Sequence, residues 1–280
     1  MIRRFAKMTI LQQIVSETRA RLAGKTNPAY RADLEKMAAA HIPRGFRKRL
    51  LGTARSGPAV IAELKKASPS KGVIRADFQV VELARAMEQA SASALSVLTE
   101  EKHFQGSLEN LRAASANVSI PCLRKDFIVD ELQMLEARAY GADAVLLIVA
   151  ALDDSELKQL CRAARALQLD VLCEVHDERE LQRAIDASFD IIGVNNRDLR
   201  TFQVTLETSL RLNAKIPANV LRVAESGIHT GADISRLRSS GYQAFLIGES
   251  LMKEHDPGAA LSKLLTDAAR GERPAEVASR

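Results

Sequence analysis

Residues 144–175 read AVLLIVAALDDSELKQLCRAARALQLDVLCEV, two apolar runs separated by an amphipathic segment. The runs Ala144–Val149 and Val171–Val175 largely lack polar alternation, which is typical of parallel strands buried on both faces. Between them, Asp154 supplies a favourable helix start and predicts a helix over Ser155–Leu167. The stretch is therefore interpreted as one strand–helix–strand unit.

The same unit recurs along most of the chain. Eight apolar runs follow residue 57, and successive runs end about 20–35 residues apart, the spacing of a (β/α)8 TIM barrel. A doubly wound open sheet is the alternative, but it usually has fewer strands and a Gly-rich dinucleotide turn, and no GxGxxG occurs here. We therefore predict an α/β protein with a single barrel. The other six runs are Ala59–Leu64, Ala94–Leu98, Pro121–Leu123, Ile191–Val194, Leu221–Ala224 and Ala244–Ile247, and further helices are expected over Phe78–Gln89, Asp130–Tyr140 and Glu178–Ala187.

The residues before the barrel predict a helical extension. Residues 8–24 place Leu11 and Ile14 on one helical face, which indicates a helix that caps the barrel or lies against it. Asn27 and Pro28 start a second helix that runs to Ala40. We expect an N-terminal helical extension over residues 1–56, the catalytic barrel over residues 57–270, and a polar, frayed tail over residues 271–280.

The composition is that of a globular protein, since 46% of the 280 residues are apolar and 27% are charged. No stretch approaches the roughly 18 apolar residues of a membrane span, and Gln12, Gln13 and Glu17 interrupt any secretory signal. The three cysteines lack CxxC spacing, which excludes a disulfide framework and a zinc ribbon and suits a reducing compartment. We expect a cytoplasmic protein that contacts no membrane.

Positive charge is concentrated at the start of the chain. Residues 1–56 carry thirteen Lys and Arg against three acids (+10), whereas the remainder carries 27 against 32 (−5). A basic segment can bind nucleic acid, but the chain has no Trp, 4% aromatic residues and no recognisable nucleic-acid module. We therefore expect no nucleic-acid partner and interpret the segment as a solvated face or as an attraction for an anionic substrate.

Charged and polar residues appear where several predicted strands end, and a purely structural strand does not need them there. In a barrel these ends meet at the carboxyl-terminal face, where such proteins place their chemistry. Glu63 and Lys65 alternate with the apolar Ala62 and Leu64, so both charges point to the barrel axis. An isolated buried charge is expensive, so we expect these groups to pair with one another or with a ligand. Five strands contribute Glu63, Lys65, Lys125, Glu174, Asn195 and Glu225.

Two glycine-containing turns follow the seventh and eighth strands, Ala224–Ile228 (AESGI) and Leu246–Ser250 (LIGES). Loops seven and eight are the usual phosphate site of such barrels, because small residues let backbone N–H groups approach an anion. We predict a phosphorylated small-molecule ligand, with tight turns that need glycine for steric reasons as the alternative. The polar loop Lys66–Gly72 after the first strand is a candidate lid, and an ordinary exposed turn is the alternative there.

Other polar residues are weaker candidates. His176 follows Glu174, and we interpret it as a residue at a helix N-terminus or one with a structural hydrogen bond. The other histidines show no metal-ligand pattern, so we expect no metal site. We also expect repulsion among the lysines of the mouth to lower their pKa values, with Glu63 and Glu174 opposing this effect.

Taken together, the strand-end motifs resemble one enzyme family, the indole-3-glycerol phosphate synthases. The resemblance covers about residues 8–268, and its first motif is specific to that family. The matching stretches are Val60–Gly72 (VIAELKKASPSKG), Leu95–Glu100 (LSVLTE), Leu123–Ile128 (LRKDFI), Cys173–His176 (CEVH), Gly193–Leu199 (GVNNRDL), Ala224–Ile228 (AESGI) and Ile247–Met252 (IGESLM).

The resemblance implies a carboxy-lyase of tryptophan biosynthesis that acts on 1-(2-carboxyphenylamino)-1-deoxyribulose 5-phosphate. The reaction closes the indole ring and releases carbon dioxide and water. An aromatic carbon attacks a carbonyl that gains a proton, and a hydroxyl leaves later, so the site needs acids. The reaction has no redox step, so no cofactor is implied.

The resemblance also implies roles for individual residues. Lys125 is the implied general acid at the ketone, and Glu174 is its acid–base partner. Lys65 resembles the lysine that contacts the substrate carboxylate, and Glu63 resembles the group that orients the lysines and serves as a base in the dehydration. The remaining implied contacts are Asn195 and Glu225 to sugar hydroxyls or the carboxylate, Arg197 in support of the sixth loop, Ser68 and Lys71 closing over the ligand, and Ser226, Gly227, Gly248, Glu249 (through its backbone N–H) and Ser250 at the phosphate.

Two other functions stay open at this point. Another phosphate-sugar barrel enzyme, an isomerase or an aldolase that forms a Schiff base on Lys125 or Lys65, needs similar residues. A non-catalytic sensor built on the same barrel is expected to lose some of the mouth charges, and this chain keeps a full set. We expect a monomer or a weak homo-oligomer.

Overall fold

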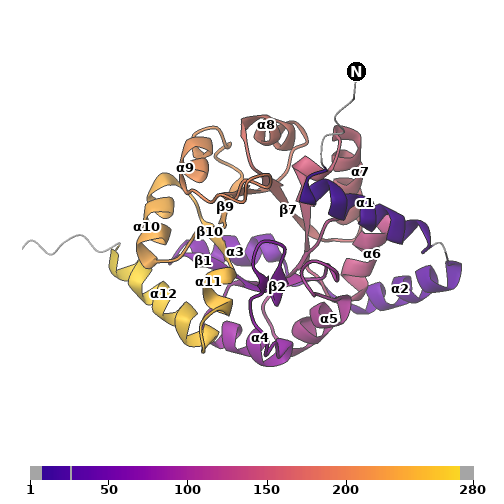
Figure 1. Cartoon of the computed structure of the whole chain (residues 1–280), viewed down its shortest axis with the longest axis horizontal. Coiled ribbons are helices and arrows are strands. Elements are labelled where there is room, and N and C mark those ends of the chain that lie inside the picture. Colours follow the sequence, from indigo (N-terminus) through magenta and orange to yellow (C-terminus); the bar gives the residue numbers. More distant parts are fainter. Residues whose placement is uncertain (1–7, 26, 272–280) are drawn as a thin grey trace, which may run out of the picture.

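The computed structural model describes residues 8–25 and 27–271, and in it eight parallel strands form a closed barrel (Figure 1). Neighbouring strands follow one another in chain order, and β1 pairs with both β4 and β10, which closes the sheet. The predicted (β/α)8 barrel is therefore confirmed. The strands are β1 (Ala59–Leu64), β4 (Ala94–Leu98), β5 (Cys122–Lys125), β6 (Ala144–Ile148), β7 (Asp170–Val175), β8 (Ile191–Asn195), β9 (Leu221–Glu225) and β10 (Ala244–Ile247).

Helices follow the strands and cover the outside of the barrel (Figure 1). The predicted helices are present within one or two residues of their expected bounds, and the run expected to end at Val149 instead enters a short 3-10 helix, η1 (Val149–Ala151). In the described part of the chain, no helix has the length and apolar character needed to cross a membrane. The covering helices are α4 (Val80–Gln89), α5 (Leu108–Asn117), α6 (Glu131–Ala139), α7 (Asp154–Ala166), α8 (Glu178–Asp186), α9 (Glu207–Asn213), α10 (Gly231–Ser240), α11 (Glu249–Met252) and α12 (Pro257–Gly271).

Side-chain alternation along the strands divides the core into two layers. Ile61 of β1 packs inside the barrel with residues such as Leu172 of β7, whereas Ala62 and Leu64 pack outward against the helices. Glu63 has the same inward parity as Ile61, and it lines the mouth of the barrel. The inner layer therefore changes from apolar to charged as β1 approaches its carboxyl end.

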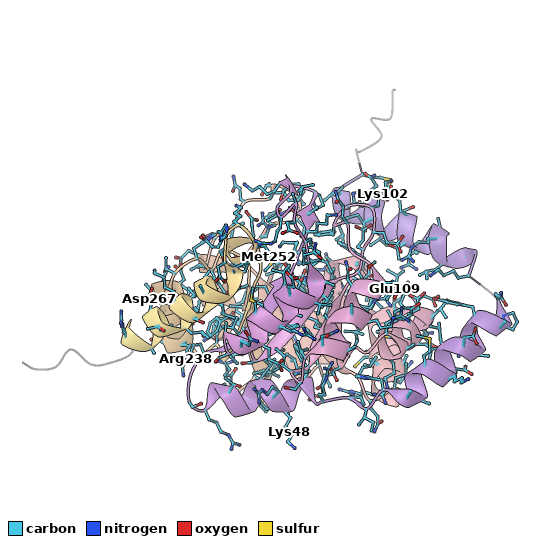
Figure 2. The ribbon with its side chains drawn as sticks, turned by 90° about the horizontal axis from the view of Figure 1, so that it is seen from below. Lys48, Lys102, Glu109, Arg238, Met252 and Asp267 are labelled. Carbon is cyan, nitrogen blue, oxygen red and sulfur yellow. The ribbon has the colours of Figure 1, made fainter. Side chains whose placement is uncertain are left out.

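Among the described residues before the barrel, three helices occur: α1 (Ile10–Ala23), α2 (Pro28–Ala40) and α3 (Phe46–Ala54). The first two were predicted, but α3 was not. Its Phe46 and Leu50 are fully buried in the inner layer, and Figure 2 shows Lys48 of α3 on the opposite side of the molecule from Lys102, which follows β4. Helix α3 thus closes the end of the barrel that lies away from the mouth.

The predicted boundaries of the extension and the barrel stay predictions, because both layers of the barrel core include residues of the extension. Leu22 of α1 packs in the outer layer, and α3 packs in the inner one. Residues 272–280 of the tail that we expected to fray lie outside the described residues.

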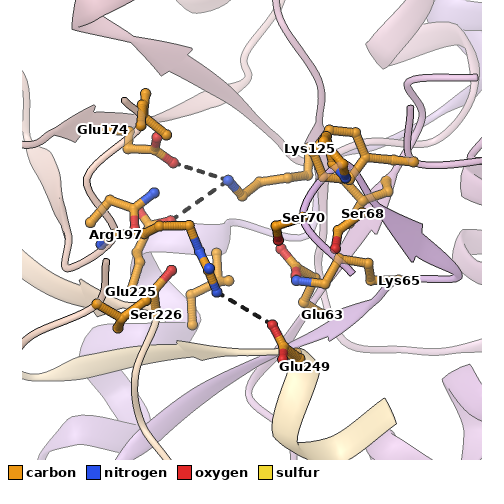
Figure 3. Close-up of a pocket in the computed structure, with 18 of the residues that line it drawn as sticks. Glu63, Lys65, Ser68, Ser70, Lys125, Glu174, Arg197, Glu225, Ser226 and Glu249 are labelled. Atoms are coloured by element: carbon orange, nitrogen blue, oxygen red, sulfur yellow. Dashed lines mark hydrogen bonds and ion pairs between the residues drawn. The ribbon is translucent and has the colours of Figure 1, made fainter. Parts of the chain in front are cut away.

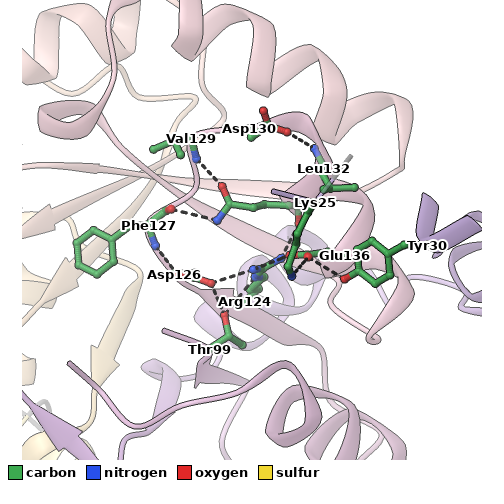
Figure 4. A network of polar contacts seen from close by, with 11 residues as sticks. Lys25, Tyr30, Thr99, Arg124, Asp126, Phe127, Val129, Asp130, Leu132 and Glu136 are labelled. Carbon is green, nitrogen blue, oxygen red and sulfur yellow. Dashed lines mark hydrogen bonds and ion pairs between the residues drawn. The ribbon is translucent and has the colours of Figure 1, made fainter. Parts of the chain in front are cut away.

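A buried polar network ties the extension to the barrel just behind Lys125 (Figure 4). The fully buried Arg124 lies 2.9 Å from Asp126 and 3.2 Å from Glu136 of α6. Lys25 Nζ and the Tyr30 hydroxyl each donate to Oε1 of Glu136 at 2.9 Å. Glu136 therefore links the segment between α1 and α2 to β5, the strand that carries Lys125.

This network makes Glu136 important for stability. Glu136→Gln removes one of the two buried carboxylates that face Arg124, and it also removes the carboxylate that pairs with Lys25. Breaking a buried pair costs about 3–5 kcal/mol. Glu35→Gln is the matched control, because Glu35 pairs with Arg31 on the surface of α2, where such pairs contribute about 0.3–0.5 kcal/mol. Urea denaturation measures the loss in the free energy of unfolding for each variant. Equal losses in the two variants would contradict the role of Glu136 in stability.

Candidate active site

A cavity of about 500 Å³ opens at the carboxyl-terminal ends of the strands (Figure 3). Every residue predicted to take part in catalysis, substrate binding or phosphate binding lies in the lining of this one cavity. These residues come from strands and loops all along the barrel, and their roles stay predictions. They are Glu63, Lys65, Ser68, Lys71, Lys125, Glu174, Asn195, Arg197, Glu225, Ser226, Gly227, Gly248, Glu249 and Ser250.

The two charged residues at the carboxyl end of β1, Glu63 within the strand and Lys65 just after it, pair with each other. Lys65 Nζ lies 2.5 Å from Glu63 Oε1, and both side chains are largely buried. A Cβ atom at Gly248 would come within 2.5 Å of the same oxygen, so this glycine leaves the space that the Glu63 carboxylate occupies. Gly248 therefore shapes the β1 pair as well as the turn in which the sequence analysis placed it.

Lys125 is the cation at the centre of the mouth. Its Nζ lies 3.0 Å from Glu174 Oε2 and 3.7 Å from Glu225 Oε2 (Figure 3). Burial works against the charged amine, but the carboxylates of Glu174, Glu225 and Glu63 outweigh it and raise the pKa of Lys125 above its ordinary value. The expectation that lysine repulsion lowers this pKa was wrong, because the nearest charges are carboxylates.

Glu174 and Glu225 are neighbouring carboxylates with different surroundings. Glu174 faces two cations, Lys125 and His176, and despite burial these lower its pKa below the ordinary value. Burial and the negative charge of Glu174 raise the pKa of Glu225 to about 8. Oε1 of Glu225 has no hydrogen-bond partner among the residues that the structure describes. Glu174 is thus the ionised member of the pair, and Glu225 is the member that retains a proton near neutral pH.

Gly193 was not predicted individually from the sequence. It lies within the buried strand β8, and a Cβ atom there would collide with Oε1 of Glu225 and come within 3.0 Å of Leu172 Cδ1. The glycine therefore allows Glu225 to lean across the neighbouring strand into the mouth. A glycine inside an otherwise apolar strand is a sequence signal for such a close approach.

The two glycine-containing turns lie against each other at one side of the cavity. Ser226 and Gly227 both adopt the left-handed backbone conformation, with φ values of 66° and 76°. The Ser250 hydroxyl donates to the carbonyl oxygen of Ile228 at 3.1 Å, which connects the turn after β10 to the turn after β9. The structure therefore provides one compact region of small residues where the sequence predicted an anion site.

The Glu249 carboxylate is compensated by two cations. Arg197 Nη2 lies 3.3 Å from it (Figure 3), and Lys253 Nζ lies 2.6 Å from it. These cations keep the pKa of Glu249 below its ordinary value despite partial burial. Asn195 accepts the backbone N–H of Arg197 through Oδ1 at 3.1 Å, so it also holds the loop that carries this arginine.

The loop after β1 forms a small hairpin over the cavity. Strands β2 (Ala67–Ser68) and β3 (Gly72–Val73) pair in antiparallel register. The hairpin brings Ser68 and Lys71 to the lining, as the candidate lid requires, and it adds Ser70, which the sequence analysis did not select.

An apolar wall completes the cavity. It was not predicted from the sequence, because the candidate site residues were chosen from the polar ends of the strands. Ile10 and Ile14 of α1 line the cavity together with Phe104 and Phe127, whose ring centroids are 6.0 Å apart. Glu17 holds α1 in place through Lys102 at 2.7 Å and His103 at 3.0 Å. The amphipathic pattern of residues 8–24 was the available signal, since its apolar face points at the mouth.

Comparison with solved structures supports the fold alone. 3-Hexulose-6-phosphate synthase from Salmonella typhimurium matches with a TM-score of 0.62 and 13% identity, covering 76% of this chain and 99% of that one. KGPDC from Streptococcus mutans matches with a TM-score of 0.60 and 11% identity, covering 77% of this chain and 99% of that one.

Sequence comparison is more specific. The family model described as indole-3-glycerol phosphate synthase matches residues 11–264. The indole-3-glycerol phosphate synthase of Koribacter versatilis is 60% identical over 255 residues, which cover 91% of this chain and 98% of that relative. The enzyme of the same name from Polaromonas naphthalenivorans is 47% identical over 260 residues, with 91% and 98% coverage. The chain therefore belongs to the indole-3-glycerol phosphate synthase family.

Proposed function

We propose that this cavity converts 1-(2-carboxyphenylamino)-1-deoxyribulose 5-phosphate into indole-3-glycerol phosphate, carbon dioxide and water. The observation that carries the proposal is the buried ammonium of Lys125, 3.0 Å from Glu174, in the same cavity as the Lys65–Glu63 pair. The family comparison favours this ring closure over the isomerase or aldolase that the strand-end residues alone would also allow. Since the reaction has no redox step, the proposal includes no cofactor.

The lining suggests how the substrate binds. The carboxyphenyl ring fits the apolar wall that includes Phe104 and Phe127, and the phosphate fits the turns around Gly227 and Ser250. Binding at these two ends holds the ketone between them, beside Lys125, and lowers the entropic part of the barrier. Ser68, on the β2–β3 hairpin, closes over the bound molecule.

Ring closure uses the central cation. The ring carbon that carries the carboxylate attacks the ketone carbon, and Lys125 donates a proton to the carbonyl oxygen as the carbon–carbon bond forms. The substrate nitrogen shares the resulting positive charge, which the ionised Glu174 stabilises. The carboxylate then leaves as carbon dioxide, and its bonding electrons return to the ring.

Dehydration uses the pair on β1. Lys65 contacts the substrate carboxylate in the first half of the reaction and then donates a proton to the new hydroxyl, which leaves as water. Glu63 accepts the proton lost from the carbon next to nitrogen, and because it lies 2.5 Å from Lys65 it can return that proton to the amine. One proton is consumed overall, since a carboxylate leaves as neutral carbon dioxide, and solvent supplies it.

We further propose a cytoplasmic enzyme that acts as a monomer or a weak homo-oligomer. Cys122, Cys161 and Cys173 are free and buried, which supports a reducing compartment.

Replacing Lys125 tests the proposed general acid. We expect Lys125→Met and Lys125→Arg to lower turnover by at least about 100-fold, the scale of general acid–base catalysis, with folding intact by circular dichroism. Indole fluorescence measures product formation, and Lys48→Met on the exposed face of α3 is the control. Near-normal turnover in either Lys125 variant would rule out this assignment.

Replacing Gly193 tests the space required by Glu225. Gly193→Ala should displace the carboxylate and reduce turnover by about 100-fold, the effect of roughly 1 Å of misplacement. Gly57→Ala is the matched control, because a Cβ atom there meets no atom within 4 Å. If both variants turn over substrate equally fast, Gly193 does not position Glu225.

The raised pKa of Glu225 predicts a pH-dependent stability. The carboxyl titrates near 4.5 in the unfolded chain and near 8 in the folded protein, so the folded state binds the extra proton between these values. The contribution of Glu225 to stability is therefore fully present below its pKa of 4.5 in the unfolded chain. It is lost as the pH rises through its pKa of about 8 in the folded protein. We expect Glu225→Gln to gain stability relative to the wild type between about pH 5 and pH 9 in urea denaturation. A stability difference that does not change with pH would contradict the assignment.

A further inference from the structure

His176 stands directly behind Glu174, at the junction between β7 and α8. Its Nε2 lies 3.3 Å from Glu174 Oε1, and its Nδ1 lies 2.9 Å from Glu180 Oε2. Lys125 contacts the other oxygen of Glu174. The side chains form a row of alternating charge that runs Lys125, Glu174, His176 and Glu180.

The far end of this row is rigid. Glu180 occupies the first turn of α8, where its backbone N–H donates to the capping carboxylate of Asp177 at 2.9 Å. Oε2 of Glu180 accepts the backbone N–H of His176 at 2.8 Å and also lies next to the His176 ring. The backbone and the ring of His176 are therefore held by the same carboxylate.

His176 is nearly buried, with 12% of its side chain exposed, and it is not among the residues that line the cavity. It can therefore affect the reacting atoms through Glu174 and not by touching them. A buried imidazole flanked by two carboxylates is favoured as the imidazolium, in which both ring nitrogens carry protons. Although burial opposes the charge, Glu174 and Glu180 raise the pKa of His176 to about 10.

We propose that His176 is a positioning residue whose imidazolium holds Glu174 ionised and directs its second oxygen at Lys125. This inference rests on the proposed function for its effect on catalysis. It explains why Glu174 is charged whereas the adjacent Glu225 is protonated. Glu174 has a second cation, His176, and Glu225 lies farther from Lys125. The sequence-based reading of His176 as a residue with a structural hydrogen bond is thus extended to a functional role.

The charge of His176 can be tested without any activity. In protein labelled with 15N at histidine, long-range proton–nitrogen correlation spectra near pH 8 should show both ring nitrogens of His176 protonated. His255, exposed in the loop between α11 and α12, gives a second histidine signal in the same spectra. His176→Gln assigns the signal by removing it. A His176 ring with one unprotonated nitrogen near pH 8 would overturn the inference.

The effect on Glu174 is tested by kinetics. His176→Gln keeps a hydrogen-bond donor but loses the charge, so the pKa of Glu174 should rise and the acidic limb of kcat/KM should move up by at least about one pH unit. We expect kcat to fall by at least about tenfold with KM within about twofold, because His176 does not touch the substrate. His255→Gln is the matched control. An unchanged kcat and acidic limb in His176→Gln would overturn the proposal.

A second variant changes the carboxylate on the other side of the His176 ring. Glu180→Gln removes one of the two carboxylates, so the His176 imidazolium should titrate at a lower pH than in the wild type, and the nuclear magnetic resonance titration measures this directly. If His176 titrates unchanged in Glu180→Gln, the charge row is not what holds its proton, and the inference fails. If the wild type makes no indole product while the His176 ring is doubly protonated, the proposed function fails but the assigned charge of His176 stands.

Discussion

The closure of the parallel sheet is the constraint on which the rest of the molecule depends. Because β1 pairs with both β4 and β10, strands from the beginning and the end of the barrel become neighbours. Closure brings the charged strand ends from both halves of the chain to one rim, where burial leaves little water to screen them. Charges enclosed in this way have to balance, and the pairs Lys65–Glu63 and Lys125–Glu174 are the result.

The same balance suits the chemistry that we propose. Lys125 is surrounded by carboxylates that stabilise its ammonium, so the acid form needed at the ketone is present throughout the neutral pH range. Glu174 is held as an anion by cations on two sides, and it is ready to stabilise positive charge on the substrate. Glu225 retains a proton because it is buried beside the negative charge of Glu174. Similar residue types thus acquire different roles from their neighbours alone.

The N-terminal helices complete the barrel at both ends. Phe46 and Leu50 of α3 fill the interior at the closed end, and α1 supplies part of the apolar wall at the mouth. Glu136 connects this extension to Arg124, next to Lys125 in β5. The extension is therefore part of the active-site architecture, which is why the pocket combines residues from α1 with residues from the strand ends.

The apolar runs were enough to predict the number and spacing of the strands, and with them the (β/α)8 barrel and the residue types at the strand ends. Local patterns are enough for this prediction, because a strand buried on both faces appears in the sequence as a nearly continuous apolar run. Helix α3 was not predicted, because three basic residues and a glycine within it obscure the apolar pair Phe46 and Leu50. The folded arrangement was needed to learn which charges pair, that Gly193 makes room for Glu225, and that the pKa of Lys125 rises rather than falls. Ionisation depends on distances across the barrel and on the loss of water, and no local pattern in a chain encodes either quantity.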